Sequence, residues 1–302
     1  MTFPNVVFHV GYHKTGTTWM QRRLFQPAHG YLPLMSHEDV FAEITRPHKL
    51  AFDPAAAREM IAARMDETQT NVPVVSSEIL SGHPFWGGRD SADFAERIAA
   101  ITPDAKILLT IRAQIPAIAS VYMQYVRRGG RLPAKRFFGG AKVLGFDGFD
   151  PVHFEYHRLV ARYQELFGSE NVKVLTQEQL ARDPEGFVAD LRGFTGAAET
   201  PLPSTEREGA SETEIAVPLL RRFNMIKRDG AAPDPILDLT PLSAALYRGT
   251  GWIFRRPAIK KSLGKKRPVT ALAKTLFEGR YQASNKALLE MMPGLDLPGY
   301  EI

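Results

Sequence analysis

A loop rich in glycine, lysine and threonine near the start of the chain could bind an anion. Residues 11–19 read GYHKTGTTW and separate a β-branched run at 5–10 from a predicted helix at 17–25. Backbone N–H groups and the positive end of a helix dipole converge in such a loop, and Lys14 adds a mobile charge. A Walker A loop places its lysine after the second glycine, whereas Lys14 precedes Gly16. We therefore expect a different ligand.

A second candidate anion site begins where another apolar run ends. Arg112 follows the run at 106–111, and Ser120 lies eight residues later in a predicted helix at 115–128. Arginine offers a planar fork to a phosphate, and a serine in the second turn of that helix can face the same pocket. A lone arginine at a strand end is more often a surface residue, but its combination with the Lys14 loop favours a ligand-binding role.

The order of apolar runs predicts the elements that position these residues. Candidate strands at 5–10, 72–76, 106–111 and 171–175 alternate with candidate helices at 17–25, 91–101, 115–128, 153–167 and 184–194. This alternation predicts a P-loop-like α/β fold of three layers, with a parallel central sheet flanked by helices. Ligands of such folds bind at the carboxyl ends of the strands, so both anion sites should meet at one edge.

The alternation stops near residue 196, and no internal repeat follows. Helices are predicted at 212–228, 270–277 and 284–292, with a linker at 230–235 and a basic run within 252–268. We therefore expect one domain over 1–302, with an α/β core at 1–195 and a helical and loop extension at 196–302.

Both motifs resemble those of the sulfotransferases that use 3′-phosphoadenosine 5′-phosphosulfate (PAPS), over residues 5–195. Their phosphosulfate loop has the pattern KxGTT followed by an aromatic or aliphatic residue, and many cytosolic members have proline where this chain has His13. The arginine and the serine eight residues later match the family's 3′-phosphate signature. The resemblance implies PAPS contacts by His13, Lys14, Thr15, Gly16, Thr17, Thr18, Trp19, Arg112 and Ser120. It also implies that Lys14 stabilises charge on the leaving phosphate.

Sulfuryl transfer to a hydroxyl needs a base, and two residues are candidates. Glu78 follows the second strand, where carbohydrate-directed members of the resembled family often have a glutamate, although Ile79 replaces the lysine that usually follows. Glu78 could instead be an exposed loop acid or the ion-pair partner of Lys14. His83, beside Phe85 and Trp86, is the competing base.

A third contribution to the nucleotide site could come from Lys265, Lys266 and Arg267. They resemble loosely the glycine-and-lysine loop that closes over the nucleotide in this family. A solvated charge run is the simpler explanation of these three residues. Arg255, Arg256, Lys260 and Lys261 could equally bind an acidic substrate or a membrane surface.

Composition narrows the remaining possibilities. The 38 basic residues exceed the 33 acidic ones by five, which favours anionic ligands, and the absence of cysteine excludes disulfides and thiolate chemistry. No candidate strand ends in a Walker B aspartate, so we expect no metal. No signal segment or membrane-length apolar run is evident, and by default we expect a cytoplasmic protein.

The function expected from the resemblance is transfer of the sulfuryl group of PAPS to a hydroxyl or amine, with a carbohydrate or glycolipid as favoured acceptor. The product would be adenosine 3′,5′-bisphosphate (PAP). Peripheral membrane contact is compatible with this reading, and no nucleic-acid partner is expected. Two alternatives remain: a P-loop kinase that uses magnesium ATP, and a non-catalytic module that binds polyanions.

Overall fold

Five parallel strands form a single sheet in the computed structural model, which describes residues 5–65, 70–140, 148–205, 213–229, 238–256 and 266–302. The order is β2-β3-β1-β4-β5, with bounds β1 Val7–Gly11, β2 Tyr31–Met35, β3 Val72–Ser76, β4 Lys106–Ile111 and β5 Val172–Thr176. The predicted α/β class is confirmed. The sequence prediction missed β2, because Pro33 interrupts it; proline is tolerated in this edge strand, and the register shifts beside it.

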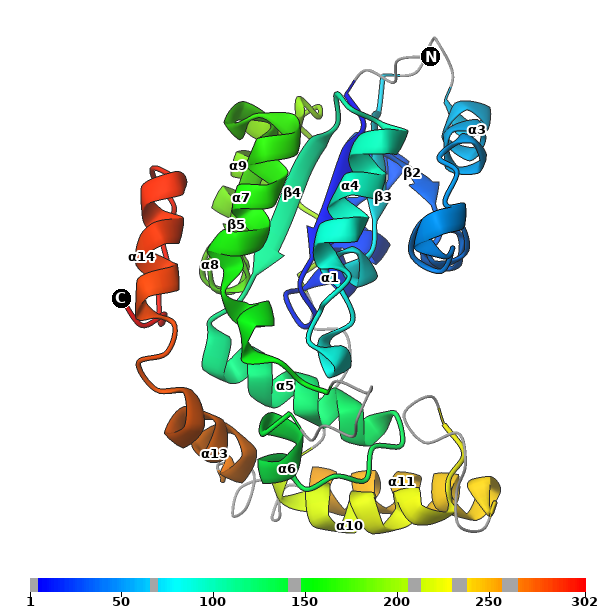
Figure 1. Ribbon diagram of the computed structural model, residues 1–302, viewed down its shortest axis with the longest axis vertical. Coiled ribbons are helices and arrows are strands. Elements are labelled where there is room, and N and C mark those ends of the chain that lie inside the picture. Colours follow the sequence, from blue (N-terminus) through cyan, green and yellow to red (C-terminus); the bar gives the residue numbers. More distant parts are fainter. Residues whose placement is uncertain (1–4, 66–69, 141–147, 206–212, 230–237, 257–265) are drawn as a thin grey trace.

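Helices cover both faces of the sheet (Figure 1). Their bounds are α1 Thr17–Trp19, α2 His37–Val40, α3 Ala55–Arg64, α4 Ser91–Ile101, α5 Gln114–Arg127, α6 Ala134–Phe138, α7 Tyr156–Phe167, α8 Gln177–Arg182, α9 Pro184–Thr195, α10 Val217–Phe223, α11 Thr240–Arg255, α13 Pro268–Phe277 and α14 Gln282–Met291. π-type turns lie at Met20–Leu24 and Phe41–Thr45, and 3₁₀ turns at Pro27–His29, Lys49–Ala51, Glu78–Ser81, Pro84–Trp86, Pro151–Phe154, Ser169–Asn171, Glu214–Ala216 and Asn224–Ile226. No described helix is long and apolar enough to cross a lipid bilayer.

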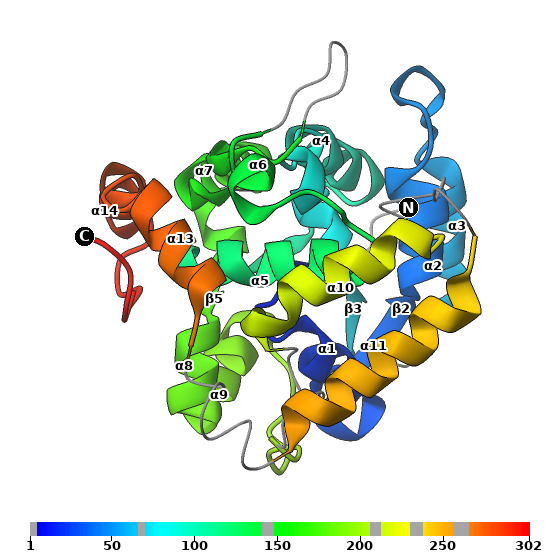
Figure 2. The ribbon, with the colours of Figure 1, turned by 90° about the horizontal axis from the view of Figure 1, so that it is seen from below.

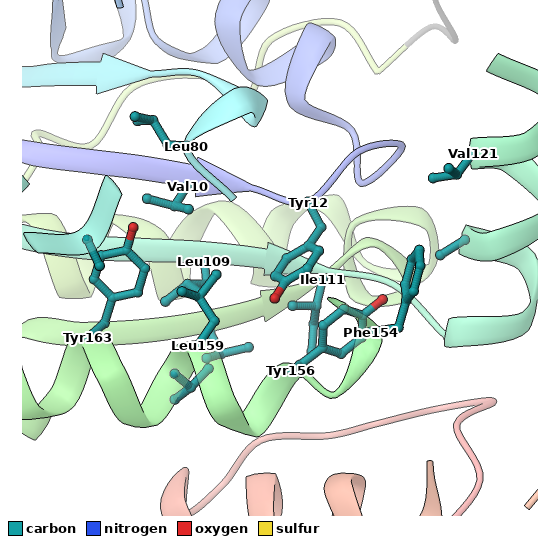
Figure 3. Packing of buried hydrophobic residues seen from close by; sticks show 14 of the residues in the cluster. Val10, Tyr12, Leu80, Leu109, Ile111, Val121, Phe154, Tyr156, Leu159 and Tyr163 are labelled. Carbon is teal, nitrogen blue, oxygen red and sulfur yellow. The ribbon is translucent and has the colours of Figure 1, made fainter. Parts of the chain in front are cut away.

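Alternate side chains of the strands enter two separate cores, because successive residues of a strand point to opposite faces. Leu108 of β4 packs in one core with Phe187 of α9. Its neighbour Leu109 packs in the other core, with Tyr163 of α7. Figure 3 shows this second core, with the aromatic rings of α7 lying against the sheet. Both faces are buried, as a parallel sheet requires.

The strand register aligns the carboxyl ends of the sheet. Gly11, the last residue of β1, pairs with Thr110 of β4, and Ile111 pairs with Thr176 at the end of β5. The loops that follow these strands therefore emerge side by side at one edge.

The C-terminal helices pack around that edge and around α5. Helix α13 packs against α5, and α14 packs against α7. Nε2 of Gln114, in the first turn of α5, donates to Oδ1 of Asn285 in α14 at 2.6 Å. Figures 1 and 2 show α10 and α11 side by side at the end of the molecule toward which the strands point. The sequence prediction missed α11, since it assigned no element between the linker at 230–235 and the basic run within 252–268.

Candidate active site

The Lys14 loop connects β1 to α1 in a conformation that two residues with positive φ define. Lys14 has φ 71° and Gly16 has φ 93°, and the carbonyl of Gly16 accepts hydrogen bonds from the N–H groups of Trp19 and Met20 as the helix begins. Glycine suits this left-handed position, whereas lysine rarely adopts it. The loop thus holds a sparsely populated backbone conformation, which is frequent at ligand sites.

Hydrogen bonds among buried polar side chains of the sheet hold the loop in place. Oγ1 of Thr15 donates to the carbonyl of Tyr12 at 2.6 Å and lies 2.9 Å from Oγ1 of Thr110. Nε2 of His9 lies 3.0 Å from the same Thr110 hydroxyl, and Nδ1 lies 2.8 Å from Oγ of Ser76. Burial lowers the pKa of His9 to about 3, so the ring is neutral at pH 7. The network ties three strands together under the loop, and the Thr15 hydroxyl belongs to this support.

Lys14 lies in a strongly positive environment. The Lys14 side chain is exposed, yet desolvation within the loop lowers its pKa, and Arg127, Arg112 and Arg128 lower it further, while Glu78 acts in the opposite direction. Perturbed pKa values of this kind cluster at functional sites, and a bound anion would offset the repulsion between these cations. Sequence reasoning missed Arg127 and Arg128, because nothing in the sequence shows that the end of α5 lies close enough to the loop to affect Lys14.

Arg112 and Ser120 lie together, as their spacing predicts. Nη1 of Arg112 donates to Oγ of Ser120 at 3.2 Å, and the hydroxyl of Tyr156 donates to the Arg112 carbonyl at 2.7 Å. Glu178 completes this corner, since its carboxylate accepts from the N–H of Ala113 at 3.1 Å. Burial raises the pKa of Glu178, which Arg112 partly offsets. Glu178 follows β5 at the strand edge, and that position was the only sequence signal for it.

The polar residues after β3 lie at the same edge. Nδ1 of His37 lies 2.8 Å from Oγ of the buried Ser77, and Glu78 opens the 3₁₀ turn that follows. Because Glu78 raises the pKa of Lys14, the carboxylate lies within electrostatic range of the lysine. A pocket of about 210 Å³ opens beside this group, lined by Gln21, Phe25, Gln26, Pro33, Met35, Ser36, His37, Val74 and Ser76.

His83, the competing base, stacks on Trp86. The ring centroids are 4.2 Å apart at an interplanar angle of 26°. Burial and then Arg128 lower the pKa of His83, so it is neutral at pH 7. The histidine therefore lies near the arginine cluster, with an exposed indole on one side.

The His13 ring has a buried nitrogen, Nδ1, whose hydrogen-bonding capacity is unsatisfied within the described part of the chain. No described residue forms a hydrogen bond with its buried Nδ1. Burial holds the pKa of His13 well below its usual range, and His153, His83, Lys14 and His37 lower it further. A neutral ring with an unsatisfied nitrogen can take part in binding a ligand at the loop.

The family comparison matches the second half of this site. Residues 88–201 match the family model described as "Sulfotransferase family". This segment of the chain is therefore similar to the sulfotransferase family. The matched segment includes Arg112, Ser120 and Glu178, while the Lys14 loop precedes it.

Solved sulfotransferase structures are similar to this chain at low sequence identity. A sulfotransferase from Alicyclobacillus acidocaldarius is 21% identical with a TM-score of 0.48, and the match covers 90% of this chain and 100% of that one. The sulfotransferase domain of the curacin biosynthetic pathway is 14% identical with a TM-score of 0.41, covering 92% and 98%. A mouse sulfotransferase complexed with PAP is 14% identical with a TM-score of 0.38, covering 91% and 90%. No curated protein matches by sequence.

The remaining residues of the Lys14 loop differ in exposure. Thr17 is buried and Thr18 is exposed, while Nε1 of Trp19 donates to the carbonyl of Ser204 at 2.8 Å. Trp19 thus anchors the loop to the chain after α9.

The C-terminal basic run is described only in part. Lys265 lies outside the described residues, and Lys266 and Arg267 are exposed. Nη1 of Arg267 lies 3.9 Å from Oε1 of Glu214. Oε2 of the same carboxylate accepts hydrogen bonds from the N–H groups of Val269 and Thr270 at the start of α13. The described contact of Arg267 is therefore structural, and its closure over a nucleotide stays a prediction.

Proposed function

We propose that this protein transfers the sulfuryl group of PAPS to an acceptor hydroxyl. One observation carries the proposal: the Lys14 loop and the Arg112–Ser120 pair follow neighbouring strands, β1 and β4, whose ends are in register. Two anion-binding elements at that spacing suit a nucleotide with phosphate at both its 3′ and 5′ positions. The unsatisfied Nδ1 of His13 and the cations around Lys14 fit such a ligand.

PAPS supplies an activated sulfuryl group when bound, and the residues of the chain divide the remaining work. The loop N–H groups and Thr18 bind the 5′-phosphate, and Arg112 with Ser120 binds the 3′-phosphate. Lys14 stabilises negative charge on the phosphate oxygen that sulfur leaves. Glu78 accepts the hydroxyl proton as the acceptor oxygen bonds to sulfur. The electrostatic effect of Glu78 on the pKa of Lys14 supports placing both residues near one reacting centre.

We further propose a carbohydrate or glycolipid as the acceptor. The support is the carboxylate after β3, which resembles the arrangement in carbohydrate-directed sulfotransferases. The pocket of about 210 Å³ beside Ser76 and His37 offers polar groups at that position.

Transfer of labelled sulfate from PAPS to a panel of glycans, glycolipids, phenols and amines tests this function. We expect glycan or glycolipid products whose formation depends on Glu78. Products limited to phenols, and dependent on His83, would contradict the assigned acceptor and base. Phosphate transfer from magnesium ATP in place of sulfate transfer would contradict the reaction itself.

A further inference from the structure

Helix α11 presents apolar side chains to solvent. Its outer face, defined here as Leu242, Ala245, Arg248, Trp252, Ile253 and Arg256, has helical spacing, and all six residues are exposed. Leu242 is 51% exposed, Trp252 61% and Ile253 45%. While they are exposed, Trp252 and Ile253 do not gain the favourable free energy that burial of their apolar area would provide. Such a face is suited to contact with an apolar surface.

The opposite side of α11 fixes this orientation. Ser243 and Thr250 are buried there, and Oγ of Ser243 donates to the carbonyl of Phe223. The hydroxyl of Tyr247 donates to Oδ1 of Asn224 at 2.6 Å. Rotation of the helix to bury Trp252 would break these hydrogen bonds, so the apolar face belongs outside.

The charged residues of α11 and its C-cap are all basic: Arg248, Arg255 and Arg256. Asp238, which precedes the helix, is paired with Arg228. The Arg256 guanidinium lies 3.8 Å from the centroid of the Trp252 ring. Beside the neighbouring α10, Arg221 and Arg222 of that helix line a pocket of about 490 Å³ together with Pro218, Met225 and Arg131, which follows α5.

We propose that the outer face of α11 docks onto an anionic lipid surface. Basic residues attract the negative headgroups, and tryptophan with aliphatic side chains inserts at the boundary between headgroups and acyl chains. A soluble polyanion would satisfy the arginines, but it would leave Ile253 and Leu242 in water. Because α11 lies at the end of the molecule toward which the strands point (Figure 1), docking would turn the active-site end of the protein to the membrane.

Vesicle binding by the full chain tests this proposal. The probes are vesicles of phosphatidylcholine alone and of phosphatidylcholine mixed with phosphatidylserine. We expect binding to the mixed vesicles only. Trp252→Ser with Ile253→Ser should weaken it at least tenfold, and Arg248→Gln or Arg256→Gln should each weaken it about fivefold, the equivalent of ~1 kcal/mol per basic residue. Leu50→Ser is the matched control, since Leu50 is 92% exposed elsewhere and should bind as the unchanged chain does.

Tryptophan fluorescence gives a second readout that needs no change in α11. In Trp86→Phe the remaining tryptophans are the buried Trp19 and the exposed Trp252. Insertion of Trp252 should shift the tryptophan emission to shorter wavelength when mixed vesicles are added. Vesicles of phosphatidylcholine alone should leave the emission unchanged. Unshifted emission, undiminished binding of the Trp252 and Ile253 variant, or binding to heparin without binding to vesicles would each overturn the proposal. Since no turnover is measured, this result is independent of sulfuryl transfer.

Discussion

Arg112 and Ser120 share a hydrogen bond of 3.2 Å across the junction between β4 and α5. One residue ends a strand and the other lies in the following helix, so their meeting depends on the geometry of the turn between them. The hydroxyl of Tyr156 fixes the Arg112 carbonyl at 2.7 Å and holds this end of the strand in place. Both side chains can therefore donate to one phosphate group.

Removal of either donor should weaken binding of nucleotides that carry a 3′-phosphate. Arg112→Ala or Ser120→Ala should reduce PAP affinity tenfold to a hundredfold, since charged hydrogen bonds contribute ~1.5–3 kcal/mol. Adenosine 5′-phosphosulfate lacks that phosphate and should bind nearly as before. Calorimetry with both nucleotides measures the difference, with Arg182→Ala as the exposed control. Equal weakening of both nucleotides would assign Arg112 and Ser120 to the fold.

Substitutions of Lys14 and of Glu78 should change different kinetic parameters, because we place the two residues on opposite sides of the transferred group. Lys14→Ala should lower both PAPS affinity and kcat. Glu78→Gln keeps the side-chain volume, so PAPS affinity should survive while kcat falls ~10²–10⁴-fold. Single-turnover kinetics separate the two effects. Near wild-type turnover by Glu78→Gln would shift the assignment of the base to His83.

The loop conformation should be required for binding beyond its effect on stability. Gly16→Ala and Gly196→Ala both place alanine at positive φ, 93° and 80°, and each should cost about 1–2 kcal/mol of stability. A Cβ at Gly16 would lie 2.9 Å from Cδ2 of Leu180, whereas one at Gly196 meets nothing within 4 Å. Only Gly16→Ala should weaken PAP binding in calorimetry. Equal affinities for both variants would remove the loop from the nucleotide site.

Stability should fall in mild acid because two histidines are buried in the neutral form. Burial lowers the pKa of His9 to about 3 and of His153 to about 4, from 6.5. As pH falls, these histidines bind protons in the unfolded chain before they do so in the folded chain. The free energy of unfolding that their neutral forms contribute is therefore present above pH 6.5 and is lost as pH falls toward 4 and 3. Each residue should contribute about 2 kcal/mol of loss between pH 6.5 and 5. Urea unfolding measures it, and His153→Phe should show a smaller loss; an unchanged loss would contradict this account.

The sequence predicted the residues at the strand ends better than the elements around them. Lys14 and Arg112 were predictable because parallel strands deliver their following residues to one edge. Arg127 and Arg128 were not, since their proximity to Lys14 depends on how α5 packs across that edge. Helix α11 was missed because its apolar residues face solvent, where hydrophobic periodicity predicts polar side chains.

Binding of PAP to the unmodified chain without metal tests the central claim most directly. The account predicts a saturable calorimetric signal and a raised melting temperature with PAP in the presence of EDTA, since a ligand of the folded state stabilises it by mass action. Magnesium ATP should give a weaker effect, because it lacks the 3′-phosphate that Arg112 and Ser120 are proposed to bind. Stabilisation by magnesium ATP with none by PAP would contradict the account.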